Sequence, residues 1–573
     1  MITPAFDADT AVYRMPAMVP GTYKVYDFGR FTDGFRALTK DGKELPVQQT
    51  DENTWKIAQA KSLYKITYKV EDTWDTKKKS DFVFEPAGTN FQKDTNFVLN
   101  NHGLFGYFEG KKKNEYQVSV THPEGFFGAT GLNNVRRKDN TDTYIVPNYM
   151  DLVDGPIMYC LPDTTHLNVG GTDILISVYS PKKLVSSKFV ADSLRLILEQ
   201  QRQYLGGKLP VNNYAFIIYL TSNPAGFQSG SLGALEHSYS SMYTLLEMEP
   251  KFIAQTVKDV AAHEFFHIVT PLNIHSYEIG DFDYNNPKMS RHLWMYEGLT
   301  EYAAHHVQIK YGTLSLEDYL IDISDKMLTA DKYNQQLSFT EMSLGCLGKY
   351  EDQYGNVYQK GALIGMCLDI KLRQLSDGKY GTQELMRDLS LKYGKNVSFT
   401  DTLLFDEIVK LTYPEIGDFL RKYVGGSEPL PFRELLGACG IEYIETRDRQ
   451  ILDPLGGYVL IMDTKNQIRL WPEEPNDFGK EMGYQKLDIL QKINGKKIKP
   501  SNAQKRITKF MSKAQEGDKI TMTVKRKTET GEWKTIELKG TLHKVSVPEK
   551  HVLVPFENPS PEQLKLRKAW INR

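Results

Sequence analysis

The chain has 573 residues and a mass of 65.5 kDa, more than one hydrophobic core usually organises, so we expect roughly three domains. Its 71 basic and 72 acidic residues give a net charge of −1, which excludes a global field that would favour nucleic acid. Apolar residues make up 40%, yet no run approaches the ~18 apolar residues of a membrane helix, so we expect a folded chain with no transmembrane segment.

The first region, 1–165, consists of short alternating segments separated by turn signals. Leu63–Val70 alternates apolar and polar residues with a period of two, and Asp41-Gly42 is typical of a hairpin turn. These patterns predict an N-terminal β domain.

The second region, 166–450, begins with strand patterns at 174–179 and 214–220, separated by a helix that ends at Gly206-Gly207. After Pro250 the apolar spacing becomes helical. The predicted helices cover 252–269, 291–311, 315–330, 357–375 and 382–393. This region is therefore predicted to combine a mixed sheet with a helical half, which makes the whole chain a multidomain α+β protein.

A third region, 451–545, returns to strand patterns with glycine turns, including Gly456-Gly457 and the segment Asp488–Gly495. It is predicted to be a small separate domain. Residues 546–573 form a C-terminal tail that we expect to pack along the surface.

The sequence Ala261-Ala-His-Glu-Phe-Phe-His267 contains an H-E-x-x-H motif within a helical pattern that Pro271 would stop. Because four residues span about one helical turn, His263 and His267 project from the same face and can bind one tetrahedral ion. Glu264 points elsewhere and can reach a water molecule on the metal, where a general base is needed. The motif predicts one catalytic Zn²⁺ per chain; satisfied core histidines and a degenerate metal site are the alternatives.

A catalytic zinc site needs a third protein ligand, and our candidate is Glu297 in a second helical segment. Loop-forming residues between His267 and Glu297 allow the chain to reverse direction. Glu301, one turn after Glu297, can orient a ligand histidine, although an exposed helix carboxylate is an equal reading.

Two further segments contain residues that could act on a substrate beside the metal. The loop from Gly226 to His237 contains Gly233 and Ala234, and its glycines allow a substrate backbone to approach closely. Tyr358 opens another helix, and its hydroxyl can stabilise an oxyanion. From spacing alone, however, a buried packing tyrosine fits Tyr358 better.

An ordered series of motifs resembles the glycyl-aminopeptidase family of zinc metallopeptidases, distant relatives of aminopeptidase N and thermolysin. The motifs cover most of the chain. They are Val19-Pro-Gly-Thr-Tyr23, Leu152-Val-Asp-Gly-Pro156, Gly233-Ala-Leu-Glu-His237, His263-Glu-Phe-Phe-His267, Asp281-Phe-Asp-Tyr284, Leu293-Trp-Met-Tyr-Glu-Gly298 and Tyr358-Gln-Lys-Gly361.

The resemblance implies a β domain, a thermolysin-like catalytic domain and a C-terminal PDZ-like domain, in that order. It implies that Glu297 is the third zinc ligand, that Tyr358 stabilises the transition state, and that Glu236 grips the free α-amine of the substrate. The last role is physically reasonable because a carboxylate can hold an ammonium by charge-assisted hydrogen bonds. Family members are often exported, which favours the periplasm or cell envelope.

These inferences predict a zinc-dependent aminopeptidase that removes N-terminal amino acids, including small ones such as Gly or Ala, from peptides. One alternative is a zinc endopeptidase, in which Glu236 contacts the substrate backbone. Another is a catalytically silent envelope protein that binds a peptide or protein C-terminus with the PDZ-like domain. The carboxylate-binding loop of that domain is not recognisable in the sequence, so a further alternative is a domain that only packs against the rest of the chain and binds no peptide.

Overall fold

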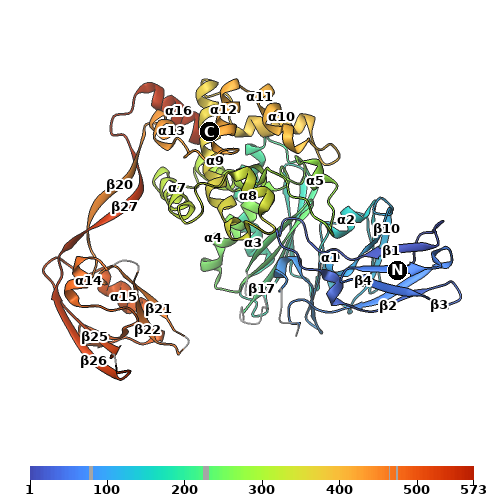
Figure 1. Cartoon of the computed structure of the whole chain (residues 1–573), viewed down its shortest axis with the longest axis horizontal. Helices are drawn as coiled ribbons and strands as arrows, with labels where there is room; N and C mark the ends of the chain where they lie inside the picture. The colour runs from blue at the N-terminus through green and yellow to red at the C-terminus, as the bar shows by residue number, and fades with distance from the viewer. Residues whose placement is uncertain (77–81, 223–231, 464, 473–474, 529, 573) are drawn as a thin grey trace. The chain divides into compact units, whose positions relative to one another are not determined.

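The computed structural model describes all residues except 77–81, 223–231, 464, 473–474, 529 and 573. The chain divides into two compact units, shown in Figure 1. Unit 1 comprises Met1–Ile441 and Phe556–Arg573, and unit 2 comprises Glu442–Pro555. The predicted multidomain α+β class, with a β-rich N-terminal domain followed by sheet and helices, is confirmed.

Within the described residues, the N-terminal part of unit 1 is built from four small sheets. Their strand orders are β4 (Val47–Asp51), β5 (Thr54–Ala58), β1 (Thr10–Arg14), β9 (Tyr107–Phe108); β3 (Glu44–Leu45), β2 (Thr32–Leu38), β6 (Lys65–Val70); β10 (Tyr116–Thr121), β13 (Thr141–Val146), β12 (Val135–Lys138); and β11 (Phe127–Ala129), β14 (Ile157–Cys160), β8 (Asn96–Leu99), β7 (Asn90–Gln92). The predicted Asp41-Gly42 turn does join two antiparallel strands, β2 and β3. Two short helices, α1 (Asn101–Leu104) and α2 (Tyr149–Val153), connect the sheets.

Residues 164–441, called the catalytic part below because they contain the predicted H-E-x-x-H motif, begin with a five-stranded mixed sheet. Its order is β15 (Thr164–Val169), β16 (Thr172–Tyr179), β17 (Asn213–Thr221), β19 (Ser240–Leu246) and β18 (Gly233–His237). The central strands β16, β17 and β19 run parallel and are almost entirely buried, as strands covered on both faces should be. Helix α3 (Ser187–Tyr204) connects β16 to β17. Strand β18 lies antiparallel at the edge, which brings Glu236 opposite Ser241.

A helical half follows the sheet. Its elements are α4 (Pro250–Phe266), α5 (Tyr277–Gly280), the π-helical segment η5 (Trp294–Leu299), α6 (Thr300–Lys310), α7 (Leu316–Ala330), α8 (Phe339–Gly345), α9 (Asn356–Leu375), α10 (Thr382–Lys392), α11 (Leu404–Leu411), α12 (Pro414–Tyr423) and α13 (Phe432–Ala438). Helix α9 is buried on nearly all sides and packs against η5, α6 and α7. Helix α4 packs between α3 and α6, so the H-E-x-x-H segment lies inside the domain.

The C-terminal helix α16 (Pro561–Ile571) returns to unit 1, where Trp570 is fully buried. The indole N–H of Trp570 donates to the hydroxyl of Tyr302 at 2.9 Å. On the same helix as Tyr302, His306 places Nε2 2.7 Å from the Trp570 carbonyl oxygen and Nδ1 2.9 Å from the Tyr204 hydroxyl. The chain end is thus anchored to α6 through buried polar contacts.

Unit 2 contains the paired strands β20 (Ile441–Leu452) and β27 (Lys544–Pro555) and a second sheet. The order of that sheet is β21 (Tyr458–Met462), β22 (Ile468–Pro472), β23 (Ile489–Ile493), β25 (Lys519–Lys527), β26 (Trp533–Thr541), with β24 (Lys496–Lys497) pairing β23. Helices α14 (Asp477–Met482) and α15 (Ala503–Met511) complete the unit, which has its own apolar core. The PDZ-like assignment stays a prediction.

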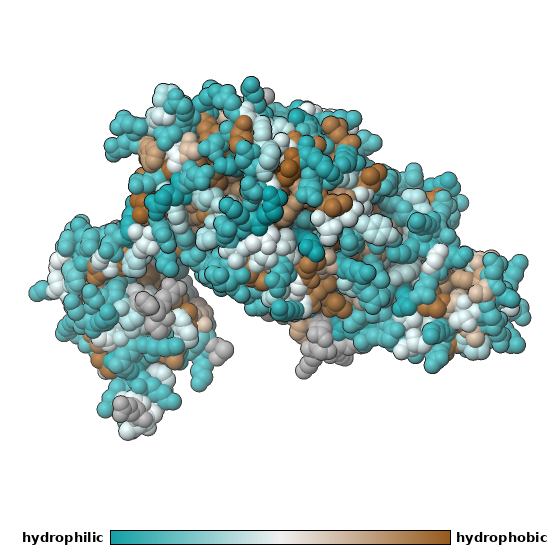
Figure 2. Space-filling model, turned by 45° about the horizontal axis from the view of Figure 1, so that its top comes forward, coloured by the Kyte–Doolittle hydropathy of each residue, from teal (hydrophilic) through white to brown (hydrophobic). Residues whose placement is uncertain are grey.

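The visible face of the molecule is mainly hydrophilic, with hydrophobic side chains in small separate groups (Figure 2). Among the described residues, no helix combines the length and the apolar character that a membrane span requires.

Candidate functional site

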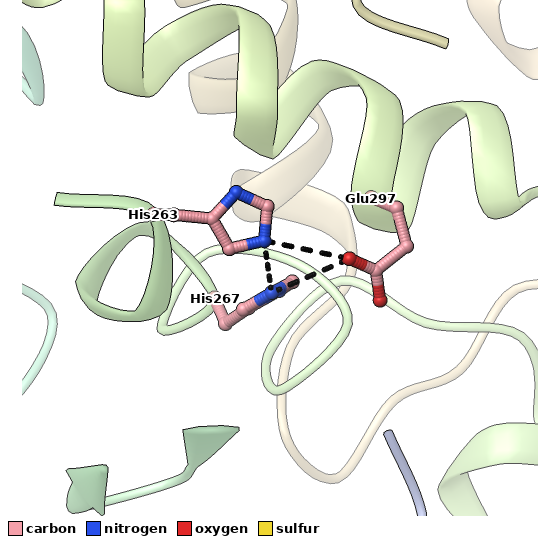
Figure 3. Close-up of side chains that lie close together, drawn as sticks. All are labelled: His263, His267 and Glu297. Carbon is pink, nitrogen blue, oxygen red and sulfur yellow. Dashed lines mark hydrogen bonds and ion pairs between the residues drawn. The ribbon is translucent and has the colours of Figure 1, made fainter. Parts of the chain in front are cut away.

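Three buried side chains from the end of α4 and from η5 converge. His263 lies in the last turn of α4, His267 directly follows that helix, and Glu297 projects from η5 (Figure 3). Glu297 Oε2 lies 3.5 Å from His263 Nε2 and 3.6 Å from His267 Nε2, and the two Nε2 atoms are 3.2 Å apart. The structure therefore brings the three predicted ligands together, with one potential donor atom of each facing the others.

The opposite nitrogen of each imidazole is held by a neighbour. His263 Nδ1 lies 2.8 Å from Glu301 Oε2, and His267 Nδ1 lies 3.1 Å from the carbonyl oxygen of Thr270. In a neutral imidazole, an acceptor beside Nδ1 keeps the ring proton on that nitrogen and leaves the lone pair of Nε2 free for a metal ion. The ammonium of Lys326 donates to Glu301 Oε1 at 2.6 Å and so holds that carboxylate in turn.

This arrangement fits a divalent metal ion. His, His and Glu form the donor set of catalytic zinc sites, in which a fourth position stays open for water. Potential ligand atoms of His263, His267 and Glu297 all lie within 4.8 Å of one another. The ion itself would supply Lewis-acid chemistry, polarising a carbonyl and lowering the pKa of a bound water molecule.

Glu297 owes its position to an irregular helix and to a close backbone contact. It sits in a π-helical segment, a geometry that often marks functional sites. Gly298 packs directly on Gly361 of α9; a Cβ atom added to Gly298 would lie 2.7 Å from backbone atoms of Gly361. This contact fixes the segment that carries Glu297 against the helix that carries Tyr358.

Glu264 is buried beside the three ligands, with 7% of its surface exposed. Its Oε2 atom has no hydrogen-bond partner within the described part of the chain. Burial raises the pKa of Glu264 to about 7, the nearby His263 opposes this shift, and the carboxylates of Glu297 and Glu301 add to it. A carboxylate that lacks a partner and binds a proton near neutral pH suits a general base.

Glu236 reaches the same cavity from β18. Burial, followed by the charges of Glu297 and Glu264, raises the pKa of Glu236 well above its usual range. Potential ligand atoms of Glu236, Glu264 and His267 lie within 4.8 Å of one another. Such a cluster of buried carboxylates favours a positively charged partner.

The strand that carries Glu236 is anchored from the N-terminal domain. Asp154 accepts a hydrogen bond from the backbone N–H of Ser238 at 3.1 Å and lies 3.2 Å from His237 Nδ1. Asp154 and His237 belong to two of the motifs that carried the resemblance, so the structure brings these two motifs into contact.

Tyr358 lies in the first turns of α9, and its ring centre is 5.6 Å from that of His263. Its hydroxyl is 2.8 Å from the hydroxyl of Tyr354. Burial, followed by the charge of Glu297, raises the pKa of Tyr358 well above its usual range, so the phenol keeps its proton as a donor.

These groups line a cavity of about 290 Å³. The N-terminal domain and the catalytic part both contribute to its wall, which consists of Gly21, Thr22, Lys24, Tyr26, Phe84, Ala234, Glu236, His263, Glu264, His267, Glu297, Tyr354 and Tyr358. Ala234 therefore lines the cavity, whereas Gly233 packs against Phe84, where an added Cβ would lie 2.9 Å from the ring. The first part of the predicted glycine-bearing loop lies outside the described residues. A larger cavity of about 550 Å³ in unit 1 contains none of the ligands in its lining.

Sequence reasoning did not identify three residues of this site. Tyr23 donates from its hydroxyl to Glu297 Oε1 at 2.9 Å, Tyr354 pairs with Tyr358, and Lys326 holds Glu301. The only signal for Tyr23 was its place in the motif Val19–Tyr23, which said nothing about a partner 274 residues away.

Comparisons with known proteins agree with this geometry. Residues 1–160 match the Peptidase M61 N-terminal domain, and residues 256–364 match the M61 glycyl aminopeptidase family. Comparison with curated proteins finds no match. The family resemblance indicated by the sequence motifs is confirmed.

A solved structure shows the same fold. The crystal structure of an aminopeptidase N family protein from Idiomarina loihiensis matches with a TM-score of 0.71 at 20% identity, covering 99% of this chain and 96% of that one. The M1 zinc metallopeptidase from Deinococcus radiodurans matches with a TM-score of 0.46 at 13% identity, covering 74% of this chain and 88% of that one. Because the second score is low, only the first match bears on the fold.

Proposed function

We propose that this chain, a metallopeptidase that carries the domains of the M61 glycyl aminopeptidase family, is a zinc-dependent aminopeptidase with a preference for small N-terminal residues. The proposal rests on one observation: a metal-binding set of side chains and a further buried carboxylate line the same cavity. His263, His267 and Glu297 form a metal-binding set, and the Glu236 carboxylate lies beside them.

The proposed mechanism assigns one task to each side chain. Glu264 takes a proton from the attacking water molecule and later passes it to the leaving amine. Tyr358 donates a hydrogen bond to the oxygen that becomes negatively charged. Glu236 accepts hydrogen bonds from the substrate α-ammonium and so places the first peptide bond at the reacting centre.

Cavity size supports the preference for small residues. Ligand pockets usually measure about 300–1,000 Å³, and this cavity, at about 290 Å³, is slightly smaller than that range. It must hold the ammonium group, the first side chain and the scissile peptide. Aromatic side chains, among them Tyr26, Phe84 and Tyr354, belong to its wall. We therefore expect Gly and Ala to be cleaved faster than Leu or Phe.

The proposal is tested with matched peptides that carry a free or an N-acetylated first residue. We expect the free peptide to be hydrolysed and the acetylated peptide to be left intact, because acetylation removes the charge that Glu236 holds. Equal cleavage of both would favour an endopeptidase instead. A panel of amino-acid amides then measures the side-chain preference.

Variants assign the effect to Glu236 and Glu264. Glu264→Gln should lower kcat by about 10²–10⁴-fold, the range for loss of a general base. Glu236→Gln should raise KM for free peptides. Glu247→Gln is the control: Glu247 is equally buried but accepts its hydrogen bonds from Ser180 and the backbone of Lys182, away from the cavity. It should keep wild-type kinetics.

Capture of a peptide C-terminus by unit 2 is not part of the proposed function. The loop before β21 already has an internal carboxylate: Asp453 accepts from the backbone N–H groups of Leu455 at 3.0 Å and Gly457 at 2.5 Å. If this loop were the carboxylate-binding site, a peptide carboxylate would have to displace Asp453.

A further inference from the structure

The two oxygens of Glu297 have different neighbours. Oε2 faces the imidazole nitrogens of His263 and His267 at 3.5 and 3.6 Å. Oε1 accepts a hydrogen bond from the hydroxyl of Tyr23 at 2.9 Å. Tyr23 belongs to the N-terminal domain, so a residue outside the catalytic part determines how this carboxylate is presented.

The backbone around Tyr23 is shaped for this contact. Tyr23 has φ 50°, in the left-handed region that aromatic residues rarely occupy and that tends to be retained at functional sites. Gly21, two residues earlier, has φ +86° and passes so close to Glu236 that an added Cβ would lie 2.5 Å from Oε1. The turn therefore approaches both the metal-binding set and the amine-binding carboxylate.

The aromatic ring of Tyr23 is also fixed, because it is packed and buried. It packs on Tyr354 with ring centres 4.7 Å apart, and only 8% of Tyr23 is exposed. Because the ring cannot swing away without losing this packing, the hydroxyl stays directed at Glu297.

We propose that Tyr23 is a positioning residue that keeps Glu297 a one-oxygen metal ligand. The inference rests on the proposed metal site. With Oε1 engaged by Tyr23, Glu297 offers Oε2 alone to the ion, and a coordination position is left for water, as a catalytic site requires. Without the hydroxyl, the carboxylate can turn to present both oxygens, which fills that position and loosens the orientation of the ligand.

The test compares Tyr23→Phe, which keeps the packed ring, with Tyr13→Phe. Tyr13 is a buried tyrosine of the same β domain whose hydroxyl accepts from the Gly106 N–H and pairs with Tyr68. Zinc affinity is measured by competition with a chelator. Coordination is measured by the visible spectrum of the protein loaded with Co²⁺, whose absorption falls when the ion gains a fifth ligand. Tm is recorded for each variant.

We expect Tyr23→Phe to bind zinc about 10- to 100-fold more weakly, as loss of a group that orients a metal ligand usually does, and to show the weaker Co²⁺ absorption. Tyr13→Phe should lower Tm and leave both metal readouts at wild-type values. Unchanged zinc affinity and an unchanged Co²⁺ spectrum in Tyr23→Phe would overturn the proposal.

A double-mutant cycle shows whether Tyr23 acts through Glu297. In a Glu297→Ala background, Tyr23→Phe should cause no further loss of zinc affinity, because its only partner in this role is gone. A further loss as large as in the wild-type background would refute the assignment. Failure of the wild-type chain to bind Zn²⁺ or Co²⁺ at all would instead remove the proposed function on which this inference rests.

Discussion

Glu301 lies between His263 and Lys326: one carboxylate oxygen is 2.8 Å from His263 Nδ1, and the other receives the Lys326 ammonium at 2.6 Å. The alternative interpretation of Glu301 from the sequence, a solvent-exposed helix carboxylate, does not fit the structure, because its side chain is only 16% exposed. That Glu301 orients the ligand histidine stays a prediction, which a measurement of metal affinity can decide.

Glu301→Ala should weaken zinc binding by about 10- to 100-fold, because His263 loses the acceptor that fixes its ring and its tautomer. Glu301→Gln keeps an acceptor oxygen and should lose less. Chelator competition measures both variants, with Glu317→Gln, an exposed glutamate on α7, as the control. Equal zinc affinity in all three variants would show that Glu301 does not orient the ligand.

Gly298→Ala should destabilise unit 1 and impair the site together. The added Cβ would lie 2.7 Å from the backbone of Gly361, so η5 and α9 must separate, at a cost of about 1–3 kcal/mol for an overpacked core. Because these two segments carry Glu297 and Tyr358, we expect kcat to fall as well as Tm. In Gly437→Ala the added Cβ meets nothing within 4 Å, and stability and activity should stay near wild type. Wild-type behaviour of Gly298→Ala would mean that the contact is not rigid.

His306 should make the stability of unit 1 depend on pH. Burial lowers the pKa of His306 to about 3, and the nearby Asp369 only partly opposes this shift, while Lys310 and Arg373 add to it. The folded state thus binds fewer protons than the unfolded state between about pH 6.5 and pH 3, so stability falls as pH falls through this window. The expected loss from this residue is roughly 2 kcal/mol between pH 7 and pH 5.

The measurement for this prediction is unfolding of the metal-free protein against pH in wild type and His306→Asn. The variant should be less stable at pH 7, because it loses the contacts to Tyr204 and Trp570, yet should lose less stability on acidification. Parallel pH profiles for the two proteins would contradict the assigned cause.

Unit 2 should not distinguish peptides by their C-terminus. Since Asp453 occupies the loop amides, a free carboxylate gains nothing over an amide. Binding of labelled peptides with free or amidated ends, measured by anisotropy on the full-length Glu264→Gln variant, should give equal values. A clear preference for the free acid would instead support the alternative that unit 2 captures C-termini.

Sequence periodicity predicted the regular elements well, because buried faces impose a regular spacing. The strand patterns at 174–179 and 214–220 correspond to β16 and β17, and the helices at 357–375 and 382–393 correspond to α9 and α10. The predicted helix 291–311 is in fact the π-helical segment followed by α6, a change of winding that an apolar spacing cannot reveal. Domain boundaries, the PDZ-like assignment and the cell-envelope location stay predictions.

Two members of the metal-binding set, His263 and His267, were predictable for a local reason. Together with Glu264 they lie within five successive residues, so helix geometry alone sets their directions. Tyr23 was not predictable, because its contact with Glu297 depends on how a β domain docks on the helical half. No spacing rule connects two residues that meet only through tertiary structure.

The most direct test of the central claim is a crystal structure of the protein grown with zinc, with anomalous scattering measured on both sides of the zinc absorption edge. We expect one zinc peak per chain, bound by Nε2 of His263, Nε2 of His267 and a single oxygen of Glu297, with Glu264 and Glu236 facing the same cavity. A zinc-loaded crystal with no peak among these three side chains would contradict the account.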